Sequence, residues 1–85
     1  MEEADVLVAQ FKKNASEEVR VSIGEFQGHK LISLRVYFRS ATGEWLPSRK
    51  GLALGVDRYQ ELLNAVLKVG QALQVQGLKG TGSRL

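Results

Sequence analysis

An alternating stretch that ends in a two-residue turn is the feature that most constrains how this chain can fold. From Val19 to Phe26, apolar and non-apolar residues alternate with a period of two, which is typical of a strand with one buried face. Gln27 and Gly28 then have the composition of a two-residue hairpin turn, because glycine adopts a positive φ at little cost. Residues 29–39 are rich in strand formers. The sequence therefore predicts an antiparallel hairpin.

The two-residue loop also fixes which residues face one another across the hairpin. The predicted aliphatic face carries the pairs Ile23 with Ile32, Val21 with Leu34 and Val19 with Val36. The opposite face carries Arg20 with Arg35, Ser22 with Ser33, Gly24 with Leu31 and Phe26 with His29, followed by Tyr37 and Arg39. Two arginines that face each other repel, and an anion bound between them would remove this conflict.

Further extended segments are predicted on both sides of the hairpin. Residues 44–46 begin a third short strand, which Pro47 interrupts or places at an edge. A loop or bulge at residues 48–51 precedes a fourth strand at residues 52–54, so the sheet is a meander. Residues 6–11 form either an added edge strand or the start of a short helix, and we favour the strand.

From Val56 onward, the apolar residues follow helical spacing and predict one helix of roughly 17 residues. Its apolar stripe is wider than one sheet face needs, which indicates a second packing partner, most simply the same helix of another subunit. The residues expected in this homodimer interface are Leu62, Leu63, Val66, Leu67 and Gly70. Together the elements predict an α+β fold, a four-stranded antiparallel meander followed by one long C-terminal α-helix (ββββα).

Chain length and composition also favour self-association. The 85 residues leave room for one thin core, and a chain with no Cys and one His has no disulfide and hardly any metal ligand to reinforce it. We expect an N-terminal segment at residues 1–17, a single nucleic-acid-binding and dimerisation domain at residues 18–75, and a flexible glycine-rich tail at residues 76–85. No cofactor and no metal are expected.

The charge of the chain is unevenly distributed. Residues 1–18 have a net charge of −3, whereas residues 19–51 carry six Lys or Arg against two Glu, a net +4. A basic middle section is typical of a protein with a polyanionic partner. The acidic start does not resemble a signal peptide, and no apolar run is long enough for a membrane span. We expect a cytoplasmic, nucleoid-associated protein, or a nuclear one if the source is eukaryotic.

Three segments, at residues 20–28, 34–38 and 43–54, follow the order of a known family. They run as a strand with a Phe-x-Gly turn, a strand with Arg-x-Tyr-aromatic, and Gly-Glu-x-x-Pro-x-Arg-Lys-Gly before an aliphatic strand. The chain thereby resembles the positive-cofactor-four family of transcriptional coactivators, in a prokaryotic or phage-type stand-alone version without a Ser-rich and Lys-rich leader. The resemblance implies a sheet backed by a helix, a dimer formed through the helices, and two channels for antiparallel single strands of DNA.

The resemblance also implies roles for individual residues. Phe26 and Phe38 match positions that stack on bases, and Arg35, Arg49 and Lys50 match positions that contact the DNA backbone or base edges. The full set expected to bind nucleic acid is Arg20, Phe26, His29, Arg35, Phe38, Arg39, Trp45, Arg49 and Lys50.

Some of these positions depart from the family or have a second interpretation. Gln27 and Leu46 stand where the eukaryotic coactivators tend to carry lysines, and His29 replaces another basic residue, so weaker affinity is expected. Strict alternation places Phe38 on the aliphatic face, where it fills a core unless a bulge redirects it. Trp45 likewise suits a core as well as a stacking platform.

These observations favour a non-catalytic, largely sequence-independent single-stranded DNA-binding protein, with a role in transcription, replication or repair. Enzyme function is not expected, because no nucleophile lies near a base in a recognisable motif and no phosphate-binding Gly-x-x-x-x-Gly-Lys pattern is present. The alternatives are a dimeric protein-interaction module that contacts transcription or replication proteins, and an RNA-binding protein.

Overall fold

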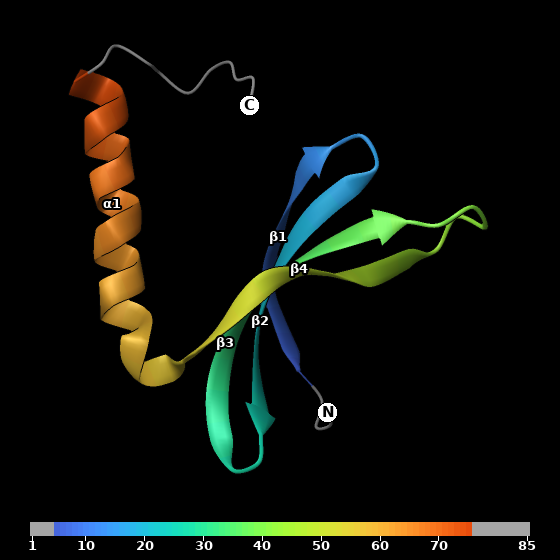
Figure 1. Cartoon of the computed structure of the whole chain (residues 1–85), viewed down its shortest axis with the longest axis horizontal. Helices are drawn as coiled ribbons and strands as arrows, with labels where there is room; N and C mark the ends of the chain where they lie inside the picture. Colours follow the sequence, from blue (N-terminus) through green and yellow to red (C-terminus); the bar gives the residue numbers. More distant parts are fainter. Residues whose placement is uncertain (1–4, 76–85) are drawn as a thin grey trace.

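The computed structural model describes residues 5–75, which form one antiparallel sheet followed by one long helix (Figure 1). The elements are β1 (Val6–Asn14), β2 (Glu17–Phe26), β3 (His29–Arg39), β4 (Trp45–Gly55), the one-turn 3-10 helix η1 (Val56–Arg58) and α1 (Tyr59–Val75). The strand order is β1-β2-β3-β4, so every strand pairs with its neighbour in sequence. The predicted α+β fold with ββββα order is confirmed.

The hairpin between β2 and β3 has the predicted turn and the predicted register. Gln27 and Gly28 have φ values of 52° and 82°, as a type I′ turn requires. The pairing begins with Phe26 opposite His29 and continues through Arg20 opposite Arg35 to Glu17 opposite Phe38. Because side chains alternate between faces, this register separates a polar face from an aliphatic face.

The N-terminal segment forms an edge strand, as we favoured, and the alternative of a short helix is wrong. β1 pairs with β2 from Val6 to Asn14 and shifts register at two irregularities. Its turn into β2 is held by Asn14, whose side-chain oxygen accepts a hydrogen bond from the Ser16 N–H at 3.0 Å. This N-terminal strand is therefore one of the four strands of the sheet and precedes the predicted hairpin.

The expectation of two short strands at residues 44–46 and 52–54 is wrong, because β4 runs continuously from Trp45 to Gly55. Pro47 lies opposite Tyr37 on the edge strand, the kind of strand in which proline is tolerated. A bulge between the pairs Arg35–Gly51 and Tyr37–Pro47 absorbs the extra residues.

Gly51 is essential to the shape of this bulge. Its φ is 146°, and a Cβ at this position would overlap the carbonyl oxygen of Leu34 on β3. Only glycine combines this backbone conformation with so close an approach of two strands.

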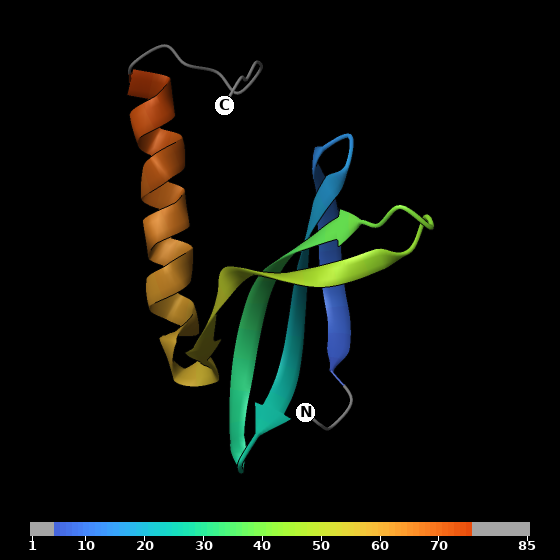
Figure 2. The same cartoon turned by 45° about the vertical axis from the view of Figure 1, so that its right-hand side comes forward.

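The helix stands beside the sheet instead of lying on it, contrary to the expected sheet backed by its own helix (Figures 1 and 2). The 3-10 helix η1 contacts β3 and β4, and Leu62 and Leu63 are the half-buried residues of α1. Among residues 5–75, Ile32 is the one hydrophobic residue that is buried, and it retains 8% exposure. No helix in this part of the chain is long and apolar enough to cross a membrane.

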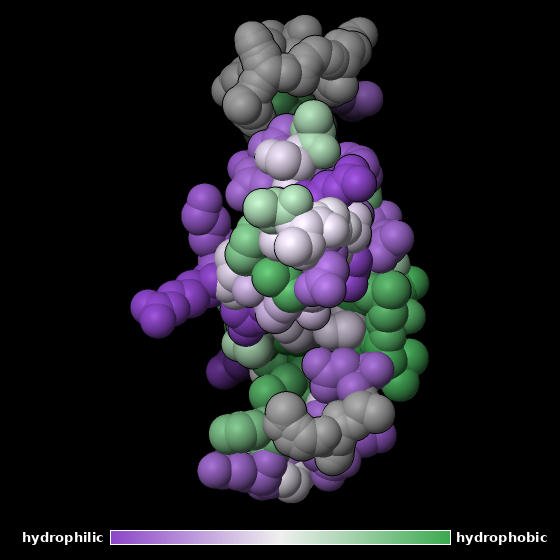
Figure 3. Space-filling view, turned by 90° about the vertical axis from the view of Figure 1, so that its right-hand side faces the viewer, coloured by the Kyte–Doolittle hydropathy of each residue, from purple (hydrophilic) through white to green (hydrophobic). Residues whose placement is uncertain are grey.

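Apolar side chains consequently remain exposed along one side of the molecule, while hydrophilic side chains occupy much of the remaining surface in Figure 3. The large apolar residues exposed on the sheet include Val6, Phe11, Ile23, Phe38, Leu46 and Leu52. Those exposed on α1 include Tyr59, Val66, Val69 and Leu73.

Candidate nucleic-acid interface

The polar face of the sheet gathers most of the residues expected to bind nucleic acid. The β2–β3 register places Arg20, Phe26, His29 and Arg35 on this face, and Arg39 with its partner Trp45 extends it toward the other end. Phe26 is 54% exposed although it is aromatic. An aromatic ring that has no core to fill on a face lined with arginines is free to stack on a planar ligand.

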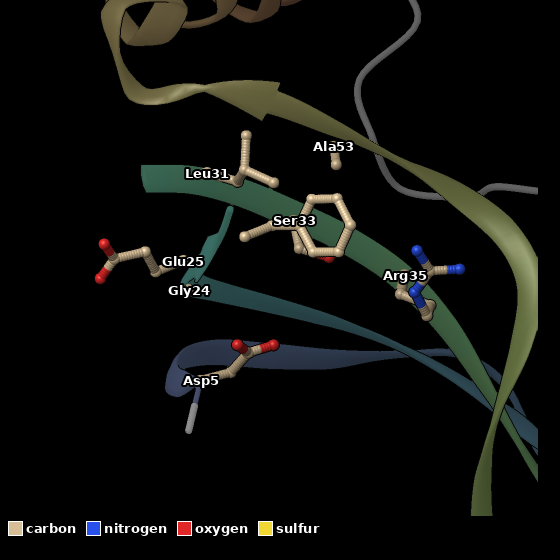
Figure 4. Close-up of a pocket in the computed structure, with 8 residues that line it drawn as sticks. Asp5, Gly24, Glu25, Leu31, Ser33, Arg35 and Ala53 are labelled. Carbon is tan, nitrogen blue, oxygen red and sulfur yellow. The ribbon is translucent and has the colours of Figure 1, made fainter. Parts of the chain in front are cut away.

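Two hollows lie on the polar face, with volumes of about 180 Å³ and 190 Å³. The first is lined by Phe26, Leu31 and Ala53 and the second by Arg20, Ser22 and Tyr37, among others. Three residues line both hollows: Asp5, Ser33 and Arg35 (Figure 4). The hollows are therefore adjoining parts of one concave surface.

Intramolecular contacts compensate the repulsion between the two facing arginines. The Nε of Arg20 donates a hydrogen bond to a carboxylate oxygen of Glu18 at 2.6 Å, and its guanidinium lies 4.2 Å from the ring centre of Tyr37. The guanidinium of Arg35 donates to the backbone carbonyl of Ser48 at 3.1 Å. The conflict that an anion was expected to resolve is already relieved within the chain.

Glu18 is the only polar residue in the described part of the chain that is buried, with 6% exposure. On β2 it pairs with Lys12 of β1 on one side and with Tyr37 of β3 on the other. Its carboxylate fixes one rotamer of Arg20, because a charge-assisted hydrogen bond is short and directional. From the sequence we noted only that acidic residues lie at the start of this strand. We did not predict that Glu18 would bind Arg20, two residues further along the same face of that strand.

Ser48 organises the bulge that carries Arg49 and Lys50, and sequence reasoning missed this role too. Its hydroxyl donates to the carbonyl of Val36 at 2.7 Å and accepts from the N–H of Lys50 at 3.0 Å. Since its own carbonyl accepts from the Arg35 guanidinium, Ser48 connects the Arg35 side chain and the backbone of Lys50 to β3. A hydroxyl residue inside a predicted bulge was the only available signal.

Lys50 also has an acidic neighbour. Its Nζ lies 3.9 Å from a carboxylate oxygen of Glu17, and both groups are accessible to water. Hydrogen bonds from Asn14 and Lys13 to the carboxylate hold the pKa of Glu17 below its usual range. The lowered pKa keeps Glu17 ionised near neutral pH, so its carboxylate partly neutralises the Lys50 ammonium.

The remaining candidate residues are divided between the two faces. Trp45 lies opposite Arg39, and the Lys12 ammonium sits 5.3 Å from the centre of its ring. Phe38 lies opposite Glu17 and Leu46, away from the polar face, and is 38% exposed. The structure brings Trp45 to the polar face and places Phe38 on the other one.

The residues expected in the dimer interface lie along α1. Leu62 and Leu63 are half-buried near the start of the helix, whereas Val66 and Leu67 are exposed. Gly70 has open space where a Cβ would be. Their contribution to an interface stays a prediction.

Comparison with known proteins bears on the same stretch of chain. The family model described as Transcriptional Coactivator p15 (PC4) matches residues 13–65. The RNA polymerase II transcriptional coactivator SUB1 of Saccharomyces cerevisiae is 41% identical over 61 residues, and a putative RNA polymerase II transcriptional coactivator of Neurospora crassa is 33% identical over 58 residues. These stretches cover 71% and 68% of this chain but only 21% and 33% of the relatives' lengths.

Solved structures with the same fold come from a bacterium and a phage. A PC4 homologue of Burkholderia pseudomallei superposes with a TM-score of 0.72 at 18% identity, covering 79% of this chain and 98% of that one. A bacteriophage T5 homologue of the coactivator, implicated in recombination-dependent DNA replication, superposes with a TM-score of 0.62 at 19% identity, covering 85% and 81%. Because the family model matches more than half of the chain, the chain belongs to the PC4 family of transcriptional coactivators.

Proposed function

We propose that this protein binds single-stranded DNA on the polar face of its sheet, largely independently of sequence. The observation that carries the proposal is the exposed ring of Phe26, on a face that also presents Arg20 and Arg35. Stacking of a base on an aromatic ring contributes about 1–3 kcal/mol and tolerates any sequence, because every base has a π face.

The cationic residues supply the second part of the proposed mechanism. Arg49 and Lys50 are exposed on the edge strand, where they can follow a phosphate backbone. Their bulge is held by the hydroxyl of Ser48 and by the close approach of Gly51 to β3. A fixed bulge presents its charges without an ordering cost at the moment of binding.

We also propose a homodimer in which the apolar sheet face and α1 of two subunits cover one another. Both surfaces are exposed in the single chain, and an apolar area of this extent is rare on a soluble monomer. The positions expected to contribute are Leu62, Leu63, Val66, Leu67 and Gly70. The folded unit would then be residues 18–75, with β1 as its added edge strand.

The proposed cellular role is in transcription, replication or repair. Two relatives are named as RNA polymerase II transcriptional coactivators, and the phage homologue is implicated in recombination-dependent DNA replication. Single-stranded DNA is an intermediate common to these processes. We accordingly propose a location at the nucleoid or in the nucleus, and transcription or replication proteins as further partners.

The test is a titration of the protein with matched single-stranded DNA, RNA and duplex DNA at two salt concentrations. We expect tightest binding to single-stranded DNA, with affinity falling as salt rises. Preference for RNA would favour the RNA-binding alternative. Absence of binding to all three, in a correctly folded protein, would favour a protein-interaction module.

A further inference from the structure

A carboxylate lies in the hollow where a phosphate-binding protein would place only cations. Asp5, just before β1, lines both hollows of the polar face together with Ser33 and Arg35. It reaches this position because Gly24 on β2 has no side chain: a Cβ there would overlap the Asp5 carboxylate. The glycine thus provides the space that the carboxylate occupies (Figure 4).

The combination of charges argues against a phosphate as the occupant of this hollow. A carboxylate that accepts hydrogen bonds repels a phosphate, whereas the Arg35 guanidinium attracts one. A ligand that satisfies both must offer hydrogen-bond donors on one edge and acceptors on another. Ser33, whose hydroxyl both donates and accepts, suits the same kind of ligand.

Most of the remaining lining suits a flat ring, and the Glu25 carboxylate, which also lines the hollow, points away from Ser33 and Arg35 (Figure 4). Phe26, Leu31 and Ala53 contribute aromatic and aliphatic surface to the first hollow. Its volume of about 180 Å³ is smaller than the 300–1,000 Å³ typical of small-molecule pockets, which favours a single base over a whole nucleotide.

From these features we infer that the first hollow is a base pocket that prefers guanine, with Asp5 as its specificity-determining residue. Guanine presents the acceptors O6 and N7 to an arginine and the donors N1–H and N2–H to a carboxylate. Thymine lacks an exocyclic amine, and its single ring donor gives a carboxylate less to bind. The inference rests on the proposed binding of single-stranded DNA and adds a preference at one position along the strand.

The test compares a thymidine homopolymer with the same strand carrying one guanosine. We expect the guanosine to tighten binding to the unmodified protein about tenfold, within the range for one bidentate contact. Replacing it with inosine, which lacks the 2-amino group, should remove most of this gain. Asp5→Asn should likewise abolish the gain, because the amide replaces one of the two acceptor oxygens with an NH2 group that only donates and faces a donor of the base.

Glu61→Gln is the matched control, since it removes one negative charge from an exposed side chain on α1 that lines neither hollow. This variant should keep the full guanosine gain. The inference is wrong if the unmodified protein binds both strands equally, or if Asp5→Asn tightens both strands and keeps the gain; either outcome leaves single-stranded DNA binding standing. If neither strand binds to any variant, the proposed function itself is wrong.

Discussion

Phe26 is the residue at which base stacking and core packing make opposite predictions. Its ring is more than half exposed on the polar face, whereas Val21 is half-buried on the aliphatic face. Phe26→Ala should leave the melting temperature nearly unchanged and weaken single-stranded DNA binding by about 1–3 kcal/mol. Duplex binding, which offers no free base faces, should hardly respond. Melting curves and titrations with both kinds of DNA measure these effects.

Val21→Ala is the counterpart of this change. It should lower the free energy of unfolding by about 1–3 kcal/mol and alter binding only through unfolding. A Phe26→Ala variant that melts as early as Val21→Ala, yet binds normally when folded, would make Phe26 a core residue.

A substitution of Ser48 tests whether the bulge of β4 holds Arg49 and Lys50 in a conformation that favours DNA binding. Ser48→Ala leaves the carbonyl of Val36 and the N–H of Lys50 without their partner, which should cost about 1 kcal/mol of stability. It should also weaken DNA binding at low salt, while Ser48→Thr, which keeps the hydroxyl, should restore both properties. Equal affinity for the alanine and threonine variants would show that the hydroxyl has no positioning role.

For individual residues, the sequence predicted which residues face each other across the hairpin better than it predicted which side chains form hydrogen bonds. The pairing of Arg20 with Arg35 follows from a two-residue loop and strict alternation, and it is confirmed. The Glu18–Arg20 contact and the three hydrogen bonds around Ser48 depend on how the sheet curves and where β4 bulges. Strand alternation places Glu18 and Arg20 on one face but does not determine whether their side chains bond, and the bulge around Ser48 arises only in the folded sheet.

Among the elements, β4 shows why the strand boundaries were mispredicted. Pro47 and the polar residues that follow it have the composition of a loop, and sequence rules interrupt the strand there. An edge position tolerates the proline, and the bulge accommodates Ser48, Arg49 and Lys50 opposite Val36. The helix prediction was more accurate because helical spacing persists over the whole of α1.

Gly51 should prove the most sensitive residue of this element. Gly51→Ala forces a Cβ against the backbone of β3 at a positive φ, so the free energy of unfolding should fall by more than about 1 kcal/mol. Gly28→Ala is an informative comparison, because its φ is also positive but no atom lies near its Cβ. Chemical denaturation should rank Gly51→Ala as the more destabilising of the two, and the reverse order would contradict the close approach.

Lys50 on the same bulge tests the electrostatic contribution. If its ammonium neutralises one phosphate, Lys50→Gln should make the slope of log affinity against log salt shallower by about 0.7. Lys68→Gln, on α1 and away from the sheet, is the matched control and should leave the slope unchanged. An unchanged slope in the Lys50 variant would remove this residue from the phosphate contacts.

For the whole molecule, the single chain is more extended than a folded domain of its length. Its Cα radius of gyration is 15.0 Å, compared with about 12 Å expected for a compact domain of this size. The excess arises because α1 stands beside the sheet while the aliphatic face and the helix both expose apolar side chains. Sequence alone indicated the surplus of apolar surface but not this placement, since helical spacing does not specify which surface the helix will cover.

If the protein forms the proposed homodimer, loss of that dimer should affect the molecule more than any other change considered above. Val66 lies at the centre of the apolar stripe of α1 and is 57% exposed, so Val66→Lys should disrupt an interface without disturbing the folded chain. Gln71→Lys adds the same charge about 140° away around the helix, given 100° per residue, and should leave assembly intact. Sedimentation at micromolar concentration should report two chains for the unmodified protein and the Gln71 variant, and one chain for the Val66 variant. A mass of one chain for the unmodified protein would refute the dimer, whereas a dimer that survives Val66→Lys would move the interface away from this part of the helix and toward the aliphatic sheet face.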